Sequence, residues 1–528
     1  MVGVDGKAGG VLNAGGKKGG IVHLIGAGPG DPGLITRLGH EILQQCDVVV
    51  FDDLIPLELI AELPPNIERH YVGKRSGRKS LSQPEINQTL LDLARAGKKV
   101  ARLKGGDPLT FGRGGEEIEL LQNEKIPVVV IPGVTAMSAV SAGLGFPLTD
   151  RRMASWLLAA TGREADSSSS QVPWERLAEL KGGTFAIYMG LGTLRSTTAA
   201  LLRGGLPKST PATVISNAST GLQRTVVAPL GKLANQVETA RLETPALVII
   251  GECVALRKKQ ARQIQMPLTG LRMLVTRPRI ESARLCGLLR QQGAEPIPLP
   301  TIQIEPCGDE KGWREFARIH QQGGWLVFTS RSGVSLFIAQ LLEQRLDLRA
   351  LAGFKIAAIG AGTSQSLLES GLKTDLEPDL STVESLGAAL TYNGDLRGLS
   401  VIRIQGDRSD ETIAKIANAA GASVVLLTVY RTTYAVWEPH WIRKVIESPP
   451  DFITFTSGST VEGFISILGR KQALAVCDKS RIAVLGPSTR AIAVKSGIRV
   501  DVEARTATPE GLIEAIIADV KKTKRKGG

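Results

Sequence analysis

The fold of this chain is decided first by one short stretch, Ile21-Val22-His23-Leu24-Ile25-Gly26-Ala27-Gly28-Pro29-Gly30-Asp31. Its apolar start predicts a buried strand, and its glycines predict a tight turn that lets a ligand approach the backbone closely. A dinucleotide-binding turn is disfavoured, because Asp31 stands where the third glycine would fall and Pro29 lacks the N–H that a phosphate needs. The stretch therefore indicates either a phosphate-free or cationic ligand, or a strand-to-helix turn with no ligand.

Working outward, strand and helix signals alternate through the first half. We expect a helix from about residue 34 to 45, and further strands over residues 48–51, 100–103, 128–131, 185–188 and 246–250. This alternation predicts an α/β protein with open, largely parallel sheets that place ligands at strand ends. Residues 165–171 read as a surface loop, and the polar residues 258–270 as the main linker.

Composition excludes several classes of protein. The chain has 528 residues, of which 43% are hydrophobic and 22% charged, which suggests three or four ordinary globular domains. Aromatic residues make up 4%, too few for stacked nucleic-acid platforms. Apolar runs are too short to span a membrane, and no secretory leader is visible. Five scattered cysteines without CxxC and five scattered histidines predict no metal and a cytoplasmic location.

The net charge of +13 is concentrated at the ends of the chain. Residues 521–528 carry five lysines or arginines, and residues 1–20 form a second, glycine-rich tail. We interpret both as solvated tails, expect residues 1–20 to be disordered, and expect no specific nucleic-acid partner. The mild positive bias that remains suits a polyanionic small molecule.

The second half contains an internal repeat. Residues 325–330 match residues 452–457 at an offset of 127, and residues 356–371 match 482–497 at an offset of 126. Near-equal offsets in two segments predict two similar α/β lobes that face a common cleft.

Charged and glycine-rich motifs follow the predicted strands of the first half. The block over residues 102–117 is poor material for a helix or a strand, so its ordering indicates a binding role. Val72-Gly73-Lys74-Arg75, Pro132-Gly133-Val134-Thr135-Ala136 and Tyr188-Met189-Gly190 also stand at or near strand ends.

In this order the motifs resemble the uroporphyrinogen-III C-methyltransferases of the tetrapyrrole methylase family, over about residues 21–257. The resemblance implies two lobes, about 21–132 and 133–257, with S-adenosylmethionine between them, and a homodimer formed through this half. It implies that Asp52 accepts a proton and that Lys74 donates one. It also implies the following donor contacts: Pro29, Gly105, Gly106, Asp107, Thr110, Thr135, Ala136, Met189 and Ala218.

These residue types suit the implied chemistry. A sulfonium donor is already activated, so the enzyme needs to align carbon, methyl and sulfur rather than to supply a metal. Methylation of a pyrrole carbon leaves a proton that a carboxylate can remove. Without the flanking motifs, Asp52 would read as a turn residue and Lys74 as a surface charge. The sequence departs from the family pattern at Asp53, Arg78-Lys79, Asp150 and Ala218, which changes mainly the charge on the substrate side.

The second half resembles uroporphyrinogen-III synthase over about residues 271–520. Short matching pieces carry this resemblance: Val275-Thr276-Arg277-Pro278, Phe328-Thr329-Ser330, Ile359-Gly360, Val429-Tyr430-Arg431, Phe455-Thr456-Ser457 and Gly486-Pro487-Ser488-Thr489. It implies one lobe from about 271–300 plus 436–520 and another from 301–430, with hydroxymethylbilane between them. Tyr430 would assist the leaving hydroxyl, and the implied substrate contacts are Ser330, Thr363, Ser457, Ser488 and Thr489. For Ser330, Thr363, Ser457 and Thr489, helix capping is the competing interpretation.

Taken together, the resemblances imply a bifunctional enzyme that makes uroporphyrinogen III and methylates it twice to precorrin-2, on the route to sirohaem or cobalamin. Two alternatives stay open at this point. One is another methyltransferase of the same fold, with a corrinoid or RNA substrate, joined to a two-lobe ligand-binding module. The other is a non-catalytic ligand sensor or RNA-binding scaffold.

Overall fold

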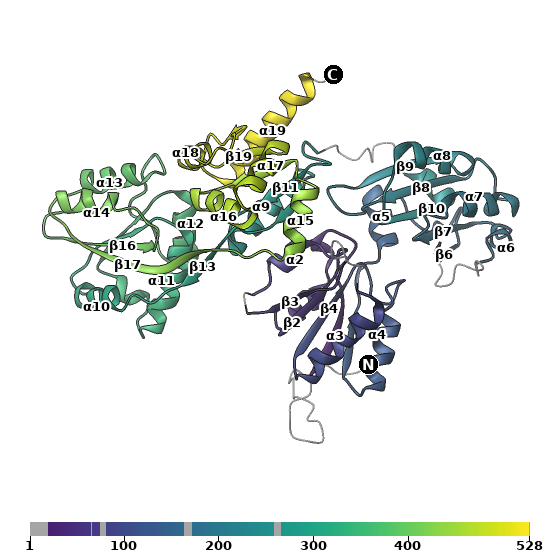
Figure 1. The fold of residues 1–528 in the computed structure, drawn as a ribbon, viewed down its shortest axis with the longest axis horizontal. Helices are drawn as coiled ribbons and strands as arrows, with labels where there is room; N and C mark the ends of the chain where they lie inside the picture. The colour runs from purple at the N-terminus through teal and green to yellow at the C-terminus, as the bar shows by residue number, and fades with distance from the viewer. Residues whose placement is uncertain (1–19, 65, 74–80, 163–171, 258–265, 527–528) are drawn as a thin grey trace.

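The computed structural model describes residues 20–64, 66–73, 81–162, 172–257 and 266–526. Several positions singled out above lie outside this part of the chain: Lys74, Arg78, Lys79, the loop at 165–171 and most of the linker. The described chain forms four five-stranded sheets, two in each half (Figure 1). None of its helices is long and apolar enough to cross a membrane.

The first sheet is parallel throughout and has the order β3-β2-β4-β1-β5. Its strands are β1 (Ile21–Gly26), β2 (Val48–Phe51), β3 (Glu68–Tyr71), β4 (Lys99–Lys104) and β5 (Val128–Ile131). The helices between them are η1 (Pro32–Leu34), α1 (Arg37–Leu43), α2 (Leu57–Ala61), α3 (Gln83–Arg95) and α4 (Gly114–Asn123). The predicted helix over 34–45 was wrong at its start: Thr36 accepts a hydrogen bond from the Gly39 amide and caps α1, so the helix begins at Arg37.

The second sheet is mixed, with the order β6-β7-β10-β8-β9. Its strands are β6 (Trp156–Thr161), β7 (Gly183–Tyr188), β8 (Pro211–Ser216), β9 (Arg224–Pro229) and β10 (Ala246–Ile250), and only β6 and β7 pair in parallel. Its helices are α5 (Ala136–Leu144), α6 (Trp174–Ala178), α7 (Leu194–Arg203), α8 (Leu230–Ala240) and η2 (Glu252–Leu256). A hairpin joins β8 to β9 without a crossover helix, and such a connection makes the pair antiparallel.

The third sheet, β12-β11-β18-β19-β20, is parallel and is built from both ends of the second half. Its strands are β11 (Arg272–Val275), β12 (Glu295–Pro298), β18 (Phe452–Phe455), β19 (Arg481–Val484) and β20 (Val502–Glu503). The fourth sheet, β13-β17-β16-β14-β15, holds the residues between. Its strands are β13 (Ile302–Pro306), β14 (Gly324–Phe328), β15 (Phe354–Ala358), β16 (Ser400–Gly406) and β17 (Ser423–Tyr434). Only β13 pairs antiparallel in it.

Helices cover both of these sheets. They are α9 (Arg279–Gln291), α10 (Glu310–Ile319), α11 (Arg331–Glu343), η3 (Leu348–Leu351), α12 (Ala361–Glu369), α13 (Val383–Tyr392), α14 (Thr412–Ala419), α15 (Pro439–Glu447), α16 (Gly458–Leu468), α17 (Arg470–Lys479), α18 (Pro487–Lys495) and α19 (Pro509–Lys526). The repeat appears as two matching units, in which β14-α11 and β15-α12 correspond to β18-α16 and β19-α18.

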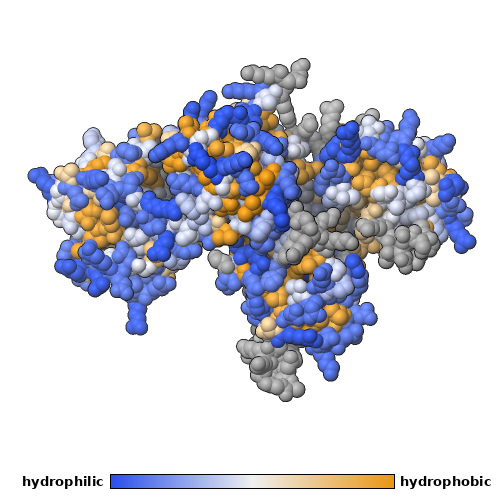
Figure 2. Space-filling model, viewed as in Figure 1, coloured by the Kyte–Doolittle hydropathy of each residue, from blue (hydrophilic) through white to orange (hydrophobic). Residues whose placement is uncertain are grey.

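Apolar residues form separate cores on the two faces of the first, third and fourth sheets. Hydrophilic residues cover much of the visible surface of each lobe, with smaller hydrophobic areas between them (Figure 2). The mixed α/β architecture with open, mostly parallel sheets confirms the predicted fold class.

Candidate active sites in the two halves

The first candidate site lies where three strand-end turns of the first sheet meet. Gly28 and Gly106 exchange backbone hydrogen bonds of 3.2 and 2.7 Å, which joins the turn after β1 to the turn after β4. A Cβ atom added to Gly26 would lie 2.5 Å from the Cα atom of Gly133, so these backbones approach as only glycine allows. The sequence-predicted Pro29, Gly105 and Gly106 therefore share one junction.

Gly106 leaves room for a ligand at this junction. Its φ of +70° favours glycine, and a Cβ atom there would have no neighbour nearer than 4.0 Å, at the Ala136 amide nitrogen and the Val134 carbonyl oxygen. A larger residue would therefore be strained and would project into open space beside the start of α5. Open space beside a glycine backbone is expected where a flat or extended part of a ligand lies against the main chain.

Asp107 connects the ends of β4 and β5. Its carboxylate accepts hydrogen bonds from the Leu109 amide at 2.9 Å, the Thr110 hydroxyl at 3.1 Å and the Gly133 amide at 3.1 Å. The structure thus brings Asp107 and Thr110 together and fixes the loop that leads to Thr135.

The second sheet contributes to the same junction. The Tyr188 hydroxyl, at the end of β7, lies 2.5 Å from the Thr135 hydroxyl and accepts the Met137 amide at 3.2 Å. Met189 follows with a φ of +53° and a half-exposed side chain. A Cβ atom on Gly30 would lie 2.7 Å from the Ala218 carbonyl oxygen, so the turn after β1 also reaches the loop after β8.

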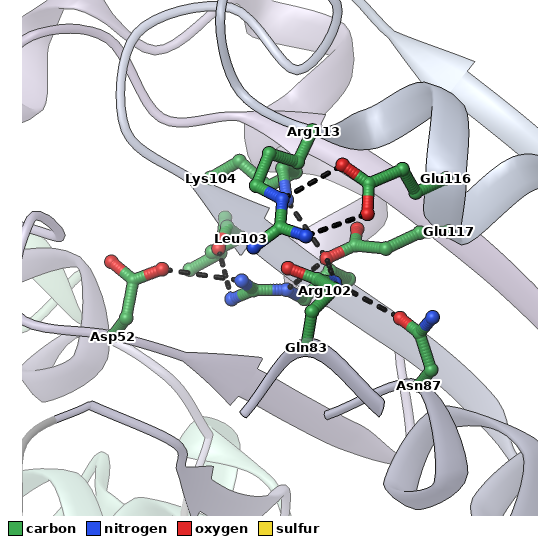
Figure 3. A network of polar contacts seen from close by, with 9 residues as sticks. All are labelled: Asp52, Gln83, Asn87, Arg102, Leu103, Lys104, Arg113, Glu116 and Glu117. Atoms are coloured by element: carbon green, nitrogen blue, oxygen red, sulfur yellow. Dashed lines mark hydrogen bonds and ion pairs between the residues drawn. The ribbon is translucent and has the colours of Figure 1, made fainter. Parts of the chain in front are cut away.

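Asp52, at the end of β2, is anchored by a buried charge network (Figure 3). The guanidinium of Arg102 lies 3.2 Å from the Asp52 carboxylate and 3.4 Å from that of Glu117. The ammonium of Lys104 lies 2.8 Å from Glu117, and burial lowers the pKa of Lys104. All three network partners of Asp52 are almost fully buried, so this carboxylate is oriented from inside the lobe.

A further contact holds Glu117 itself. Gln83, in the first turn of α3, donates to Glu117 at 3.1 Å and to Asn87 at 2.9 Å (Figure 3). Sequence reasoning picked out the block over 102–117 but gave no role to Arg102, Lys104 or Glu117. Arg102 and Lys104 are two positions apart on one strand, so their side chains lie on the same face of the sheet. That spacing could have indicated a cluster of positive charges that needs a buried carboxylate.

The second candidate site lies in the fourth sheet. The Tyr430 hydroxyl on β17 lies 3.1 Å from the Ser330 hydroxyl at the end of β14, and burial raises the pKa of Tyr430. Arg403 lies nearby on β16 with 2% of its surface exposed, and it donates to the Asp410 carbonyl. Its Nε has no hydrogen-bond partner among the described residues.

The facing sheet reaches this site through α9. Glu281 accepts a hydrogen bond from Ser332 at 3.0 Å and pairs with Arg277 at 2.6 Å. Because Ser332 is two residues from Ser330, the Tyr430 pair lies beside the contact between the two lobes.

The remaining predicted contacts of this half lie apart from Tyr430. Capping is confirmed for Ser330, which accepts the Gly333 amide, and for Ser457, which accepts the Thr460 amide. It was wrong for Thr363 and Thr489, because Gly360 and Gly486 occupy the capping positions and both threonines are buried one turn later. Ser488 is exposed, and no hydrogen bond within the described chain joins Tyr430 to Ser457, Thr363, Thr489 or Ser488.

Two hollows on the surface of the described chain lie away from both sites. One of about 320 Å³ lies beside α7 and α8, and one of about 810 Å³ lies beside α13; neither is lined by a predicted site residue. Within the described residues, no group of three or more His, Cys, Asp or Glu side chains could hold a metal ion.

Comparison with known proteins gives these sites a family. The sequence-family model for Tetrapyrrole (Corrin/Porphyrin) Methylases matches residues 22–234, and the family model for Uroporphyrinogen-III synthase HemD matches residues 283–514. The chain is 35% identical to the porphyrin biosynthesis protein HemD of Ruminiclostridium josui, over 94% of this chain and 98% of that protein.

Two further relatives match the first half alone. The siroheme synthase of Pseudomonas entomophila is 45% identical over 46% of this chain and 52% of its own length, so this chain spans about half of that relative. A crystal structure of uroporphyrin-III C-methyl transferase from Thermus thermophilus, complexed with S-adenyl homocysteine, is 37% identical. It covers 45% of this chain and 99% of its own, with a TM-score of 0.39.

Fold and sites thus define a methylase joined to a two-lobed synthase. The chain belongs to the family in which a tetrapyrrole methylase is fused to uroporphyrinogen-III synthase. It is a bifunctional enzyme of tetrapyrrole biosynthesis, with uroporphyrinogen-III C-methyltransferase and uroporphyrinogen-III synthase activities. The alternative of a corrinoid or RNA methyltransferase fused to a ligand-binding module is not favoured.

Proposed function

We propose that the two halves catalyse consecutive steps. The second half closes hydroxymethylbilane to uroporphyrinogen III with loss of water, and the first half methylates that product twice to precorrin-2. The observation that carries this proposal is the junction of strand-end turns around Gly28, Gly106 and Gly133, since open α/β sheets bind ligands at such edges.

The residues at this junction fit S-adenosylmethionine. The glycines offer bare backbone, and the Asp107 carboxylate is compatible with a positively charged donor. When bound, the donor supplies a methyl group already activated by its sulfonium. The residues proposed to hold it are Pro29, Gly105, Gly106, Asp107, Thr110, Thr135, Ala136, Met189 and Ala218. Their contribution to the rate is alignment, which can lower a barrier by several kcal/mol.

Asp52 is the proposed proton acceptor. Its carboxylate is oriented by Arg102 yet about a quarter of its side chain is exposed, so a substrate can reach it. Methylation leaves the pyrrole ring with one proton in excess, and Asp52 removes it. Lys74 is proposed as a proton donor that helps to redistribute protons on the macrocycle, so that each methylation still releases one proton overall.

In the second half, Tyr430 is proposed to assist departure of the substrate hydroxyl, with Ser330 holding its phenol. Because burial raises the pKa of Tyr430, the phenol keeps its proton at neutral pH and can donate a hydrogen bond to the leaving oxygen. Ser457, Thr363, Ser488 and Thr489 are proposed to contact the substrate elsewhere between the lobes. Shaping the flexible chain of pyrroles for ring closure is the main task of this site.

We also propose a cytoplasmic homodimer formed through the first half. The edge strand β5 supports the dimer, because the exposed Val129 offers apolar surface there. Five free cysteines, four of them buried, are consistent with a reducing compartment. The siroheme synthase relatives favour sirohaem as the end use over cobalamin.

A coupled assay tests the proposed function. The full chain receives hydroxymethylbilane and S-adenosylmethionine, and the product is followed by the dimethylated chromophore and by mass. Precorrin-2 supports the proposal. If unmethylated uroporphyrinogen III accumulated, the proposed methyltransferase reaction would be contradicted. If methylation occurred only when uroporphyrinogen III was added, the proposed synthase reaction would be contradicted.

A further inference from the structure

The synthase half packs directly against the first lobe of the methyltransferase half. Helix α2 lies against α9 and β12, and Figure 1 shows α2 in the region where the two halves meet. At this contact Glu58 of α2 pairs with Arg290 of α9, and both side chains are largely buried. This buried ion pair joins segments that are far apart in the sequence, and loss of either partner would leave the other charge buried and unpaired.

The same face of the synthase half also holds the second methyltransferase lobe. Glu295 of β12 accepts the Gly221 amide at 2.8 Å, and the Gly221 carbonyl accepts the Gly270 amide at 3.0 Å. Burial and the nearby Glu58 raise the pKa of Glu295 to about 7. One face of the synthase half therefore contacts both lobes that border the donor junction.

A ring stack extends this interface towards Asp52. Tyr71, the last residue of β3, stacks on His440 of α15 with ring centroids 4.0 Å apart and planes 3° from parallel. Trp441 packs beside them, 4.3 Å from the His440 ring. Tyr71 and His440 are both buried, so the stack forms part of the interface core.

Tyr71 in turn holds the turn that carries Asp52. Its hydroxyl donates to the Asp53 carboxylate at 2.7 Å, and Lys444 of α15 approaches the same carboxylate at 3.8 Å. Asp52 accepts the Leu54 amide at 3.1 Å and pairs with Arg102 on its other side. The turn over residues 52–54 is thus fixed from within its own lobe by Arg102 and from the interface side by Tyr71.

We propose that His440 of the synthase half is a positioning residue for methyl transfer, because it holds Tyr71 and, through Asp53, the turn that carries Asp52. This inference rests on the proposed role of Asp52. Lys444 adds a weaker contribution, since its contact with Asp53 is long and half exposed. The synthase half therefore contributes to the methyltransferase site as well as supplying its substrate.

The test uses the full chain with uroporphyrinogen III supplied directly. His440→Ala removes the stack, and we expect kcat of methyl transfer to fall about tenfold through misplacement of the turn. The dissociation constant of S-adenosylhomocysteine and the rate of cyclisation should stay unchanged. His440→Phe restores the stacked ring and should restore most of kcat. Arg443→Ala, an exposed neighbour on α15, is the matched control.

A second measurement does not depend on the role of Asp52. Hydrogen exchange of the Leu54 amide should be faster in His440→Ala than in the unmodified chain, because the turn loses its support. Unchanged kcat or unchanged exchange in His440→Ala would overturn the inference, as would equal losses in the Phe and Ala variants. Asp52→Asn, measured in parallel, separates the two ideas: full activity in that variant contradicts the role of Asp52, whatever His440→Ala does.

Discussion

The surroundings of Asp52 and of Tyr430 are built differently. Asp52 stands against buried charges, with Arg102, Lys104 and Glu117 packed beneath it. Tyr430 stands against a neutral hydroxyl, Ser330, which also caps a helix. Asp52 directly follows β2 and pairs with a buried guanidinium, whereas Tyr430 lies within β17 and its hydroxyl contacts another hydroxyl, with the buried Arg403 nearby.

This difference corresponds to the two reactions. The proposed removal of one proton after methylation favours a carboxylate held in one orientation, and the ion pair with Arg102 holds Asp52 in this way. Ring closure of a long flexible substrate depends more on its overall shape than on any one group. We therefore expect single substitutions to have large effects at the first site and small effects at the second.

The largest effect is expected for Glu117→Ala. It leaves Arg102 and Lys104 buried without their shared carboxylate, which should cost about 3–5 kcal/mol of stability. Chemical denaturation should show earlier unfolding of the first half, with methyl transfer lost and cyclisation kept. Glu116→Ala is the matched control, because its pair with Arg113 is exposed and should cost less than about 1 kcal/mol. Equal stability in both variants would contradict the importance of the network.

The next effect concerns Asp52 itself. Asp52→Asn keeps the size of the side chain and its acceptor for Leu54 but removes the proposed proton acceptor, so kcat of methyl transfer should fall about 100-fold. Calorimetry should find the affinity for S-adenosylhomocysteine unchanged. Asp92→Asn, on the exposed side of α3, controls for loss of one negative charge. A fall in donor affinity instead of kcat would place Asp52 in binding rather than proton transfer.

Strand positions were readable from the sequence to a useful degree. The apolar runs at 48–51, 128–131 and 246–250 coincide with β2, β5 and β10. Strands β2 and β10 are buried almost throughout, and such strands need continuous apolar residues. Strand β5 lies at the edge of its sheet and buries only Ile131 fully. The direction of β10 was not readable. Its sequence resembles that of a parallel strand, and its antiparallel pairing follows from how the chain connects the second sheet.

The sites were readable only where the residues stand in local motifs. Asp107 and Thr110 stand in the loop after β4 and Thr135 in the loop after β5, and Asp107 joins these two loops through its bonds with Thr110 and the Gly133 amide. The stack of Tyr71 on His440 carried no sequence signal, because it joins residues of different halves and depends on how the halves pack.

A moderate effect is expected for Tyr430→Phe. The variant loses the hydrogen bond to Ser330, so cyclisation should slow about fivefold, the equivalent of roughly 1 kcal/mol. Chromatography of the products should show more uroporphyrinogen I, which forms by spontaneous closure. Tyr434→Phe, on the same strand and in contact with Arg408, is the control. A loss of 100-fold or more would mean that Tyr430 is as decisive as Asp52, and the contrast between the sites would fail.

The smallest effects are expected for the two equivalent serine caps, one in each repeated lobe. Ser330→Ala and Ser457→Ala each remove a helix cap, so each should lower stability by about 1 kcal/mol. Only Ser330 touches Tyr430, so only Ser330→Ala should increase the fraction of uroporphyrinogen I, while Ser457→Ala should raise KM alone. Thermal unfolding measured beside the isomer ratio tests both statements. If Ser457→Ala changed the isomer ratio as much, the chemistry would belong equally to both lobes, because the caps are equivalent and only their surroundings differ.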